Sequence, residues 1–467
     1  MPLLHGQLGA RVALVVTTLQ ERITRRALAP GAKLPSIRKI AVELGVSPST
    51  AVEAYDRLVA DGAIDARRGS GFYVAAAATP FRIAAAEPRL DRAVDPMWVS
   101  RQSLDADSRY LKPGCGWLPD SWLPLDVVQR ALRQSARSDP ALLADYGPPL
   151  GYAPLRQVLA QRLAEQDIAA EPGQILLTDS GSQAIDLICR LLLNHGDTVL
   201  VDDPCYFNFI ALLRANRLNV VAVPYEPDGP DIPAFQRILK ESKPRLYITN
   251  SAVHNPTGAT LSTGKAHQLL KIAEQHRLII VEDDIFADVA DRAVPRLAAL
   301  DGLQQVIAIG SFSKTTSASI RCGYIAARRD WIESLTDMKV ATCFGGGTFS
   351  AAVIDRVLRD GGYRKHVQAL RTRLAAAMGK TAARLGTLHI VPWTAARAGM
   401  FLWAKLPDGI DSASVAKAAL ARGVILAPGN VFSVSQTATS FMRFNAAQSL
   451  NPKVFDVLEA ALRGTGC

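Results

Sequence analysis

Residues 310–325 of this 467-residue chain read GSFSKTTSASIRCGYI, and they place two cations in an otherwise small and apolar stretch. Lys314 stands between small hydroxyl residues, and Arg321 follows seven positions later. Charged side chains are costly to surround with apolar residues unless a partner compensates them. This stretch therefore predicts that Lys314 and Arg321 bind a ligand.

The stretch follows the last of six strand-like apolar runs that alternate with helical runs. The six runs are QILLTD, DTVLVDD, NVVAVPY, RLYITNS, LIIVEDD and QVIAIGS. This alternation predicts an α/β domain with a largely parallel sheet. In such a sheet a binding site forms at the carboxyl ends of the strands, where loops meet the amino termini of helices.

Polar residues stand at these predicted strand ends. The first run leads into a helix through SGSQ, whose small residues allow backbone N–H groups and hydroxyls to converge on an anion. Later runs end close to an amide, an acid and the lysine. Each residue alone fits a turn or a helix cap well, but their combination predicts a single site. The residues are Ser180, Gly181, Ser182, Gln183, Asn255, Asp283, Lys314 and Arg321.

The residue types at this site suit one ligand. A lysine that reacts with an aldehyde requires a lowered pKa or a neighbour that takes its proton. A phosphate favours the fork of Arg321, together with amides and hydroxyls such as those of SGSQ. A semi-buried carboxylate such as Asp283 favours a cationic partner, which a protonated pyridine nitrogen provides. An aldehyde, a phosphate and a pyridine together describe pyridoxal 5′-phosphate.

From about Leu111 to the carboxyl terminus, the chain resembles the fold-type I aminotransferases, and SFSKTTSASIRCGY matches their segment around the cofactor lysine. The resemblance implies that Lys314 carries the cofactor as a Schiff base, and that Asp283 pairs with the pyridine nitrogen. It implies that Arg443 in SFMRFNAA binds the substrate α-carboxylate. The further cofactor contacts that it implies are Ser311, Ser313 and Arg321 on the phosphate, Asn255 and Tyr206 on the ring, and Tyr146, lent to the neighbouring subunit's phosphate.

Two features depart from these relatives. Tyrosine usually follows their acid pair, whereas Ile285 and Phe286 follow it here, and KTTSAS lacks the Pro-Gly that is common between the lysine and the arginine. A hydroxyl near the ring oxygen is therefore predicted to be missing, which would make transamination less efficient.

The first 80 residues follow a different pattern. SIRKIAVELG and VSPSTAVEAYDRLVADG read as two short helices with Ser36 and Ser47 as N-caps, and AIDARRGSGFYVAA reads as two strands joined by a turn. This pattern predicts a winged helix-turn-helix, mostly α with a β wing. A small helical cap with a hairpin fits the pattern equally well.

This region also resembles, in sequence, the winged-helix domain of GntR-type bacterial regulators; the matching segment is PGAKLPSIRKIAVELGVSPSTAVEAYDRLVADGAIDARRGSGFYV. The family often has arginine at the position of Pro48, so one base or phosphate contact is expected to be missing. The resemblance implies a DNA face that comprises Ser36, Arg38, Ser49, Thr50, Arg67 and Gly69.

Together these features predict a multidomain chain: a winged helix at 1–78, a linker at 79–109 with a short helix around DPMWVSRQSL, and an aminotransferase-like domain with large and small subdomains at 110–467. This layout resembles the MocR/GabR family of bacterial regulators. The resemblance implies a homodimer, packed head-to-tail, that binds a double-stranded DNA operator and senses a small amine, amino acid or B6 vitamer. Two alternatives remain: an aminotransferase that carries a DNA-binding module, and a DNA-binding protein whose large domain only dimerises.

Composition restricts the class of protein further. The hydrophobic fraction of 49% is typical of a globular protein, and no apolar run has the length that a bilayer requires. The six cysteines form no CxxC pair, which favours a reducing cytoplasm and predicts no zinc site. The net charge of +10 permits contact with a polyanion without requiring one.

Overall fold

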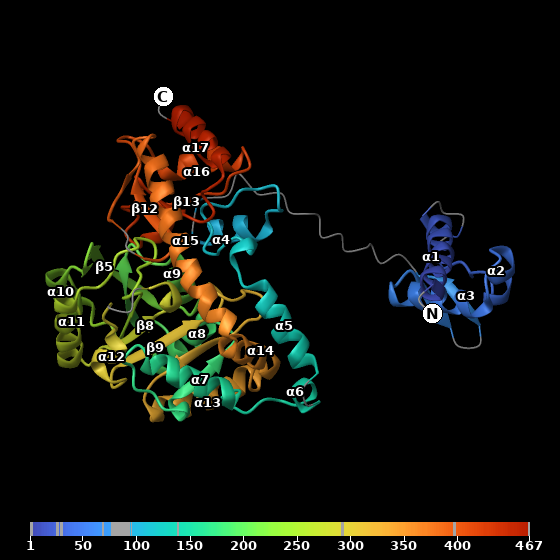
Figure 1. The fold of residues 1–467 in the computed structure, drawn as a ribbon, viewed down its shortest axis with the longest axis horizontal. Coiled ribbons are helices and arrows are strands. Elements are labelled where there is room, and N and C mark those ends of the chain that lie inside the picture. The colour runs from blue at the N-terminus through green and yellow to red at the C-terminus, as the bar shows by residue number, and fades with distance from the viewer. Residues whose placement is uncertain are drawn as a thin grey trace. The chain divides into compact units, whose positions relative to one another are not determined.

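The computed structural model divides the chain into two compact units, Met1–Ala86 and Glu87–Cys467. It describes residues 3–24, 28, 31–67, 70–75, 94, 96–137, 140–290, 294–395 and 398–465. Figure 1 shows the elements of each unit.

The first unit is a winged helix-turn-helix, as the sequence predicted. Its elements are α1 (Leu3–Thr24), α2 (Ile37–Glu43), α3 (Pro48–Ala60), β1 (Ile64–Arg67) and β2 (Gly71–Val74), with the two strands antiparallel. Ser36 and Ser47 cap the second and third helices, since their hydroxyls accept from Lys39 N at 3.3 Å and from Thr50 N at 3.2 Å. Buried apolar side chains from all three helices and both strands form one core.

The second unit contains an eight-stranded sheet in the order β3-β10-β9-β8-β7-β4-β5-β6. The six predicted runs are all strands of this sheet, and β4, β5, β7, β8 and β9 pair in parallel. The bounds are β3 (Ile175–Thr178), β4 (Thr198–Asp203), β5 (Asn219–Glu226), β6 (Gly229–Pro230), β7 (Leu246–Thr249), β8 (Ile279–Asp283), β9 (Val306–Ser311) and β10 (Gly323–Ala326).

Strand β10 runs against both of its neighbours. Gly323, at its start, pairs with Thr178 at the end of β3 and with Ser311 at the end of β9. Because of this reversal, the segment that precedes β10 arrives at the edge of the sheet where its neighbours end.

Helices cover both faces of the sheet because its central strands are apolar on both sides. Helices α8 (Gly181–Leu192), α9 (Phe207–Ala215) and α13 (Arg329–Cys343) pack on one face. The other face is covered by α7 (Ala153–Ala164), α10 (Ile232–Ser242), α11 (Thr263–His276), α12 (Leu297–Asp301) and α14 (Thr348–Arg359). The remaining elements before the second sheet are α5 (Leu125–Ala136), α6 (Ala141–Ala144) and the 3-10 helices η1 (Asp120–Trp122), η2 (Pro172–Gln174) and η3 (Ala287–Val289).

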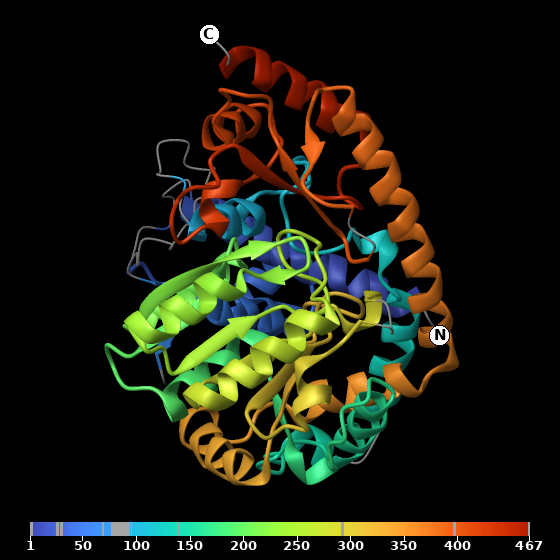
Figure 2. The same ribbon diagram turned by 90° about the vertical axis from the view of Figure 1, so that its left-hand side faces the viewer.

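A smaller four-stranded antiparallel sheet forms the carboxyl-terminal subdomain. The 26-residue helix α15 (Gly361–Gly386) leads from the large sheet to this subdomain, and Figure 2 shows it in orange along one side of the unit. The subdomain comprises β11 (Val391–Pro392), β12 (Phe401–Lys405), α16 (Ser412–Leu420), β13 (Ala427–Pro428), η4 (Gly429–Phe432), β14 (Phe441–Asn445) and α17 (Pro452–Thr465).

Part of the span expected as linker is packed structure. Helix α4 (Pro96–Asp105) forms where the sequence predicted a short helix, and Trp98 and Val99 are buried in the core of the second unit. The division between the compact units falls at 86/87, before this helix. Within the described ranges, none of the helices has the length and hydrophobicity needed to cross a bilayer.

Candidate functional site

Lys314 lies just beyond the end of β9, in a half-buried position. Its Nζ donates to the carbonyl of Gly116 at 2.6 Å. Burial, together with the charge of Arg443, lowers the pKa of Lys314 to about 8. A substantial neutral fraction therefore exists near neutral pH, and a neutral amine is the form that attacks an aldehyde.

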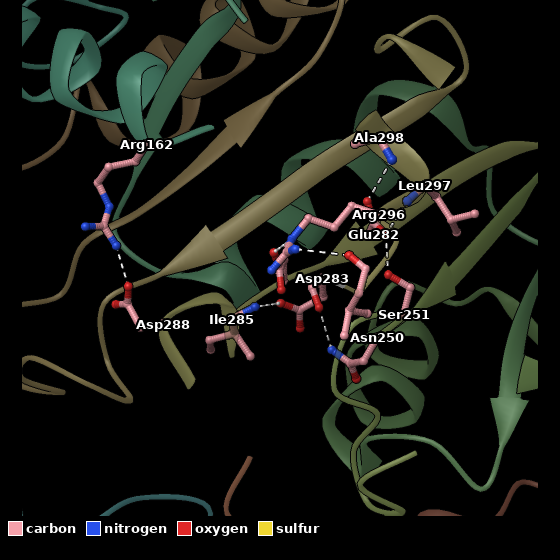
Figure 3. Close-up of polar contacts among 12 residues, drawn as sticks. Arg162, Asn250, Ser251, Glu282, Asp283, Ile285, Asp288, Arg296, Leu297 and Ala298 are labelled. Carbon is pink, nitrogen blue, oxygen red and sulfur yellow. Dashed lines mark hydrogen bonds and ion pairs between the residues drawn. The ribbon is translucent and has the colours of Figure 1, made fainter. Parts of the chain in front are cut away.

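Asp283 is the last residue of β8 and is 7% exposed. Its carboxylate accepts from Ile285 N at 3.1 Å, and its backbone carbonyl accepts from Asn250 Nδ2 at 2.8 Å (Figure 3). No cation in the described part of the chain forms an ion pair with this carboxylate, and burial raises the pKa of Asp283 to about 7. The site therefore favours a ligand that brings a positively charged N–H group to Asp283.

The two flanking acids point to other partners. Glu282 accepts from the hydroxyl of Ser251 and from the backbone N–H groups of Leu297 and Ala298 (Figure 3). Asp284 pairs with Arg296 at 2.6 Å. Successive side chains of a strand face opposite sides of the sheet, which separates Asp283 from Glu282. The structure thus singles out Asp283 among three consecutive acids.

The raised pKa gives a prediction for Asp283→Asn in the cofactor-free protein. Because the folded-state pKa lies above the unfolded value, the contribution of Asp283 to stability is present at low pH and is lost as pH rises from about 4 to about 7. We expect the free energy of unfolding of the variant, relative to the parent, to rise by about 2–3 kcal/mol between pH 5 and pH 8. Urea unfolding of both proteins at both pH values measures it, and an equal difference at the two pH values contradicts the prediction.

Arg443, on β14, is a fully buried cation. Its Nη1 donates to Asn255 Oδ1 at 2.8 Å and its Nη2 donates to Gly114 O at 2.7 Å, while its Nε has no hydrogen-bond partner. The guanidinium lies over the rings of Phe401 and Phe432, at 4.2 and 4.7 Å from their centroids. Burial lowers the pKa of Arg443 to about 10.

No acid in the described ranges forms an ion pair with Arg443. A buried cation without an acid favours an anionic ligand, and the guanidinium fork matches a carboxylate. The hydrogen bond from Arg443 places Asn255 in the same site, and the ligand contacts expected of the two residues stay predictions.

The segment 112–118, KPGCGWL, is part of the site and was missed by sequence analysis. The carbonyls of Gly114 and Gly116 accept from the two site cations, and Asn445 Nδ2 holds the segment through Cys115 O at 3.1 Å and Trp117 O at 2.8 Å. A Cβ on Gly114 would lie 2.4 Å from the carbonyl carbon of Leu426, so only glycine fits there. In the sequence, only the two glycines could have pointed to this segment. Its backbone carbonyls could not, because every residue type has one.

The SGSQ segment opens helix α8 as predicted. Ser180 Oγ accepts from Gln183 N at 3.0 Å, and Gln183 Oε1 accepts from Asp179 N at 2.6 Å. The Gln183 side chain is therefore occupied by the helix cap, whereas a Cβ on Gly181 would meet nothing within 4 Å. The N–H of Gln183 is bound by Ser180, so the N–H groups of Gly181 and Ser182 are the ones that can bind an anion on this open side.

The remaining predicted cofactor contacts lie in three places. Ser311 Oγ donates to Ser313 Oγ at 3.3 Å and to Cys322 O at 3.2 Å, beside Arg321, which has a left-handed backbone with φ of 52°. Tyr206 precedes α9. Burial raises its pKa, the charge of Arg443 opposes that shift, and the charge of Asp283 adds to it. Tyr146 is 80% exposed and packs edge-on against Phe344. Its contact with a neighbouring subunit stays a prediction.

Ile285 and Phe286 follow the acid pair, and neither side chain carries a hydroxyl. Phe286 is 1% exposed and packs edge-on against Phe401 at 5.6 Å, and Phe401 in turn lies on Arg443. This position therefore supports the arginine through ring packing.

In the first unit, Ser36, Arg38, Ser49 and Arg67 are exposed, as a DNA face requires. The Arg67 guanidinium lies over the ring of Tyr73, 4.3 Å from its centroid. Thr50 differs from the expectation, because its side chain is 4% exposed and its hydroxyl hydrogen-bonds to Ser47 Oγ at 2.8 Å. Gly69 lies outside the described residues.

The second-unit site fits pyridoxal 5′-phosphate. It offers a lysine with a lowered pKa, a buried carboxylate without a cation and an anion-binding helix terminus at one edge of the sheet. Within the described residues no group of three His, Cys, Asp or Glu could hold a metal ion.

Two known families match the chain. Aminotransferase class I and II matches residues 118–460, and the gntR family of bacterial regulatory proteins matches residues 12–74. The chain belongs to the aminotransferase class I and II family, and this membership implies pyridoxal 5′-phosphate as cofactor. With its gntR-type region it has the architecture of MocR/GabR-type regulators.

Two regulators are similar to the chain over most of its length. The uncharacterized HTH-type transcriptional regulator YdcR of Escherichia coli is 31% identical over 442 residues, covering 92% of this chain and 93% of YdcR. The uncharacterized HTH-type transcriptional regulator YdfD of Bacillus subtilis is 27% identical, and the match covers 93% of this chain and 92% of YdfD. LysN, the α-aminoadipate aminotransferase of Thermus thermophilus, shares the fold with a TM-score of 0.72 at 24% identity, over 81% of this chain and 96% of LysN.

Proposed function

We propose that the protein is a DNA-binding transcriptional regulator that binds pyridoxal 5′-phosphate at Lys314 and senses a small amino acid or amine through it. One observation carries the proposal: a single chain joins a winged helix with exposed cations to a site where Lys314, Asp283 and Arg443 converge. We further propose that it acts in the cytoplasm as a head-to-tail homodimer, with Tyr146 contributing to the neighbouring site.

The site residues divide the task of holding the cofactor. Asp283 would hold the proton of the pyridine nitrogen, and Asn255 would present its amide to the ring hydroxyl. The phosphate would be bound by Arg321, Ser311, Ser313 and the first turn of α8. When bound, pyridoxal 5′-phosphate supplies an aldehyde that reacts with amines and a ring that withdraws electrons.

The effector class follows from the pair of cationic groups. Lys314, with its pKa lowered to about 8, exchanges a proton near neutral pH, so the site would suit a ligand with a primary amine. Arg443 binds a carboxylate on the same molecule through its fork. An α-amino acid carries both groups, whereas a simple amine uses only the first.

Regulation requires that the effector bind one arrangement of the two units more tightly than another, because only this difference in affinity shifts DNA binding. DNA binding itself depends on the first unit. Arg38 is exposed on the second residue of α2, where it can contact a phosphate or a base edge.

We expect Arg38→Ala to weaken binding to operator DNA from the region upstream of the gene by about tenfold and to reduce the salt dependence, because one charge-assisted contact is lost. Fluorescence anisotropy over a series of salt concentrations measures both. Arg57→Ala is the matched control, since Arg57 is exposed in the last turn of α3, at the end opposite Ser49. Equal affinities for the two variants would contradict the assignment of the DNA face.

A second function, aminotransferase activity, is favoured by the presence of both Lys314 and Arg443 in the site. Lys314 and Arg443 together could support transfer of an amino group to a keto acid. Turnover of about 1 s⁻¹ or faster with amino-acid and keto-acid pairs would favour an enzyme that carries a DNA-binding module. Slower turnover with an effector-dependent change in DNA affinity supports the regulator.

A further inference from the structure

A second cavity, of about 570 Å³, lies between α7, α14 and α15, and residues of η3 also line it. Its volume falls within the range of small-molecule sites. Its basic lining residues are Arg162, Arg296, Arg359, Arg364 and Arg371. None of them belongs to the cofactor site described above.

Helix α15 directs free guanidinium groups into this cavity. Arg364 and Arg371 are seven residues apart and lie on one face of the helix. Arg364 is exposed and has no acidic partner within the described ranges. Arg371 donates through Nε to the carbonyl of Asp288 at 2.7 Å, which leaves its two Nη groups for another acceptor.

Other arginines of the lining already pair with acids. Arg162 reaches Asp288 from α7, as Figure 3 shows. Arg296 and Arg359 have partners of their own in Asp284 and Asp355. Among the residues that the structure describes, no acid forms an ion pair with Arg364 or with the terminal nitrogens of Arg371.

We propose that this cavity is a regulatory site for a small phosphate dianion, either free phosphate or a phosphate monoester, held by Arg364 and Arg371. Arginine forks match the tetrahedral oxygens of phosphate with paired, charge-assisted hydrogen bonds. Gln166, whose Oε1 is buried without a hydrogen-bond partner, offers an acceptor to a hydroxyl of the same ligand.

The cavity is connected to the cofactor lysine through Asp288. This carboxylate accepts from Thr315 Oγ1 at 2.8 Å and from Tyr363 OH at 2.7 Å, in addition to Arg162. Thr315 directly follows Lys314 in the chain. An anion that draws Arg162 and Arg371 toward itself weakens their hold on Asp288, and the change reaches Lys314 through the Thr315 hydroxyl.

The binding test uses the full-length protein loaded with pyridoxal 5′-phosphate, so that the cofactor phosphate site is already filled. Inorganic phosphate, glycerol 3-phosphate and glycerol are titrated by calorimetry at constant ionic strength. We expect both anions, but not glycerol, to bind, and we expect Arg364→Ala to weaken their binding at least tenfold. Tighter binding of one anion identifies the source of the phosphate group.

Lys365→Ala is the matched control, because Lys365 is an exposed cation beside Arg364 that does not line the cavity. We expect it to change the affinity by less than about twofold. No binding of either anion, or equal losses in the two variants, overturns the proposed site. The proposed phosphate site does not rest on the proposed function. If the protein takes up no cofactor, Arg364→Ala and Lys365→Ala are compared in the cofactor-free protein.

The connection to Lys314 does rest on the proposed function, and Thr315→Val tests it. This near-isosteric change removes the hydroxyl that joins Asp288 to the residue beside Lys314. We expect phosphate to alter the visible spectrum of the loaded parent protein, and the variant to bind phosphate with unchanged affinity but without that spectral change. A spectral change that persists in the variant, or is missing from the parent while phosphate binds, overturns the connection.

Discussion

Replacing Lys314 with alanine is expected to abolish the borohydride-stable attachment of pyridoxal 5′-phosphate completely. In the structure Lys314 combines a lowered pKa with a place beside Asp283 and Arg443, and its Nζ donates to a backbone carbonyl. The measurement is peptide mass mapping after reduction. We expect the variant to keep its affinity for DNA in the absence of effector and to lose the response to effector.

Lys339 provides the internal control for this experiment. It is 2% exposed, its pKa is also lowered by burial, and its Nζ donates to Pro149 O at 3.0 Å. A lowered pKa alone would allow it to react with the aldehyde, but its charged neighbours are Asp179 and Arg156, not Asp283 and Arg443. A label on Lys339, or on any lysine other than Lys314, would contradict the assignment.

The second large effect is expected for Arg443→Met. The variant keeps the volume of the side chain but removes the buried fork, so the affinity for an amino-acid effector should fall by about 100-fold or more. Affinity for amines without a carboxylate should change by less than about threefold, because they make no use of the fork. Titrations that follow the visible spectrum of the loaded protein measure both affinities.

Arg463→Met serves as the control, since Arg463 is exposed on α17 and pairs with Glu459 on the same helix. Thermal unfolding of both variants checks that they are folded. A parallel loss of affinity for amino acids and simple amines would show that Arg443 does not bind the carboxylate, and would leave the effector class to be defined by Lys314 alone.

The sequence was sufficient to predict the parts of the fold that depend on local pattern. All six apolar runs are strands. Four of them, β4, β7, β8 and β9, lie inside the sheet and are buried on both faces, which leaves an unbroken apolar signal. Ser36 and Ser47 were identified as caps because a hydroxyl before a helix accepts from its first turn. Lys314 was singled out because a charge in an apolar neighbourhood is rare, and Asp283 because it ends a predicted strand, whereas Arg443 was implied by the family resemblance alone.

Other parts depended on contacts that no local pattern records. The carbonyls of Gly114 and Gly116 bind the two site cations, and every residue type has a carbonyl. Helix α4 was predicted, but its burial was not, because it depends on a surface more than 100 residues away along the chain. Thr50 was expected to be exposed, and it is buried because its hydroxyl turns back to Ser47.

The reversed strand β10 has a consequence for how the protein is assembled. The groups that surround the expected phosphate, Ser180 and Arg321, are about 140 residues apart in sequence and meet only when β10 has inserted between β3 and β9. Closing so long a loop is slow and entropically costly. We therefore expect the pocket to be among the last features to form during biosynthesis. Pyridoxal 5′-phosphate would then bind, and stabilise, only those chains whose central sheet is complete.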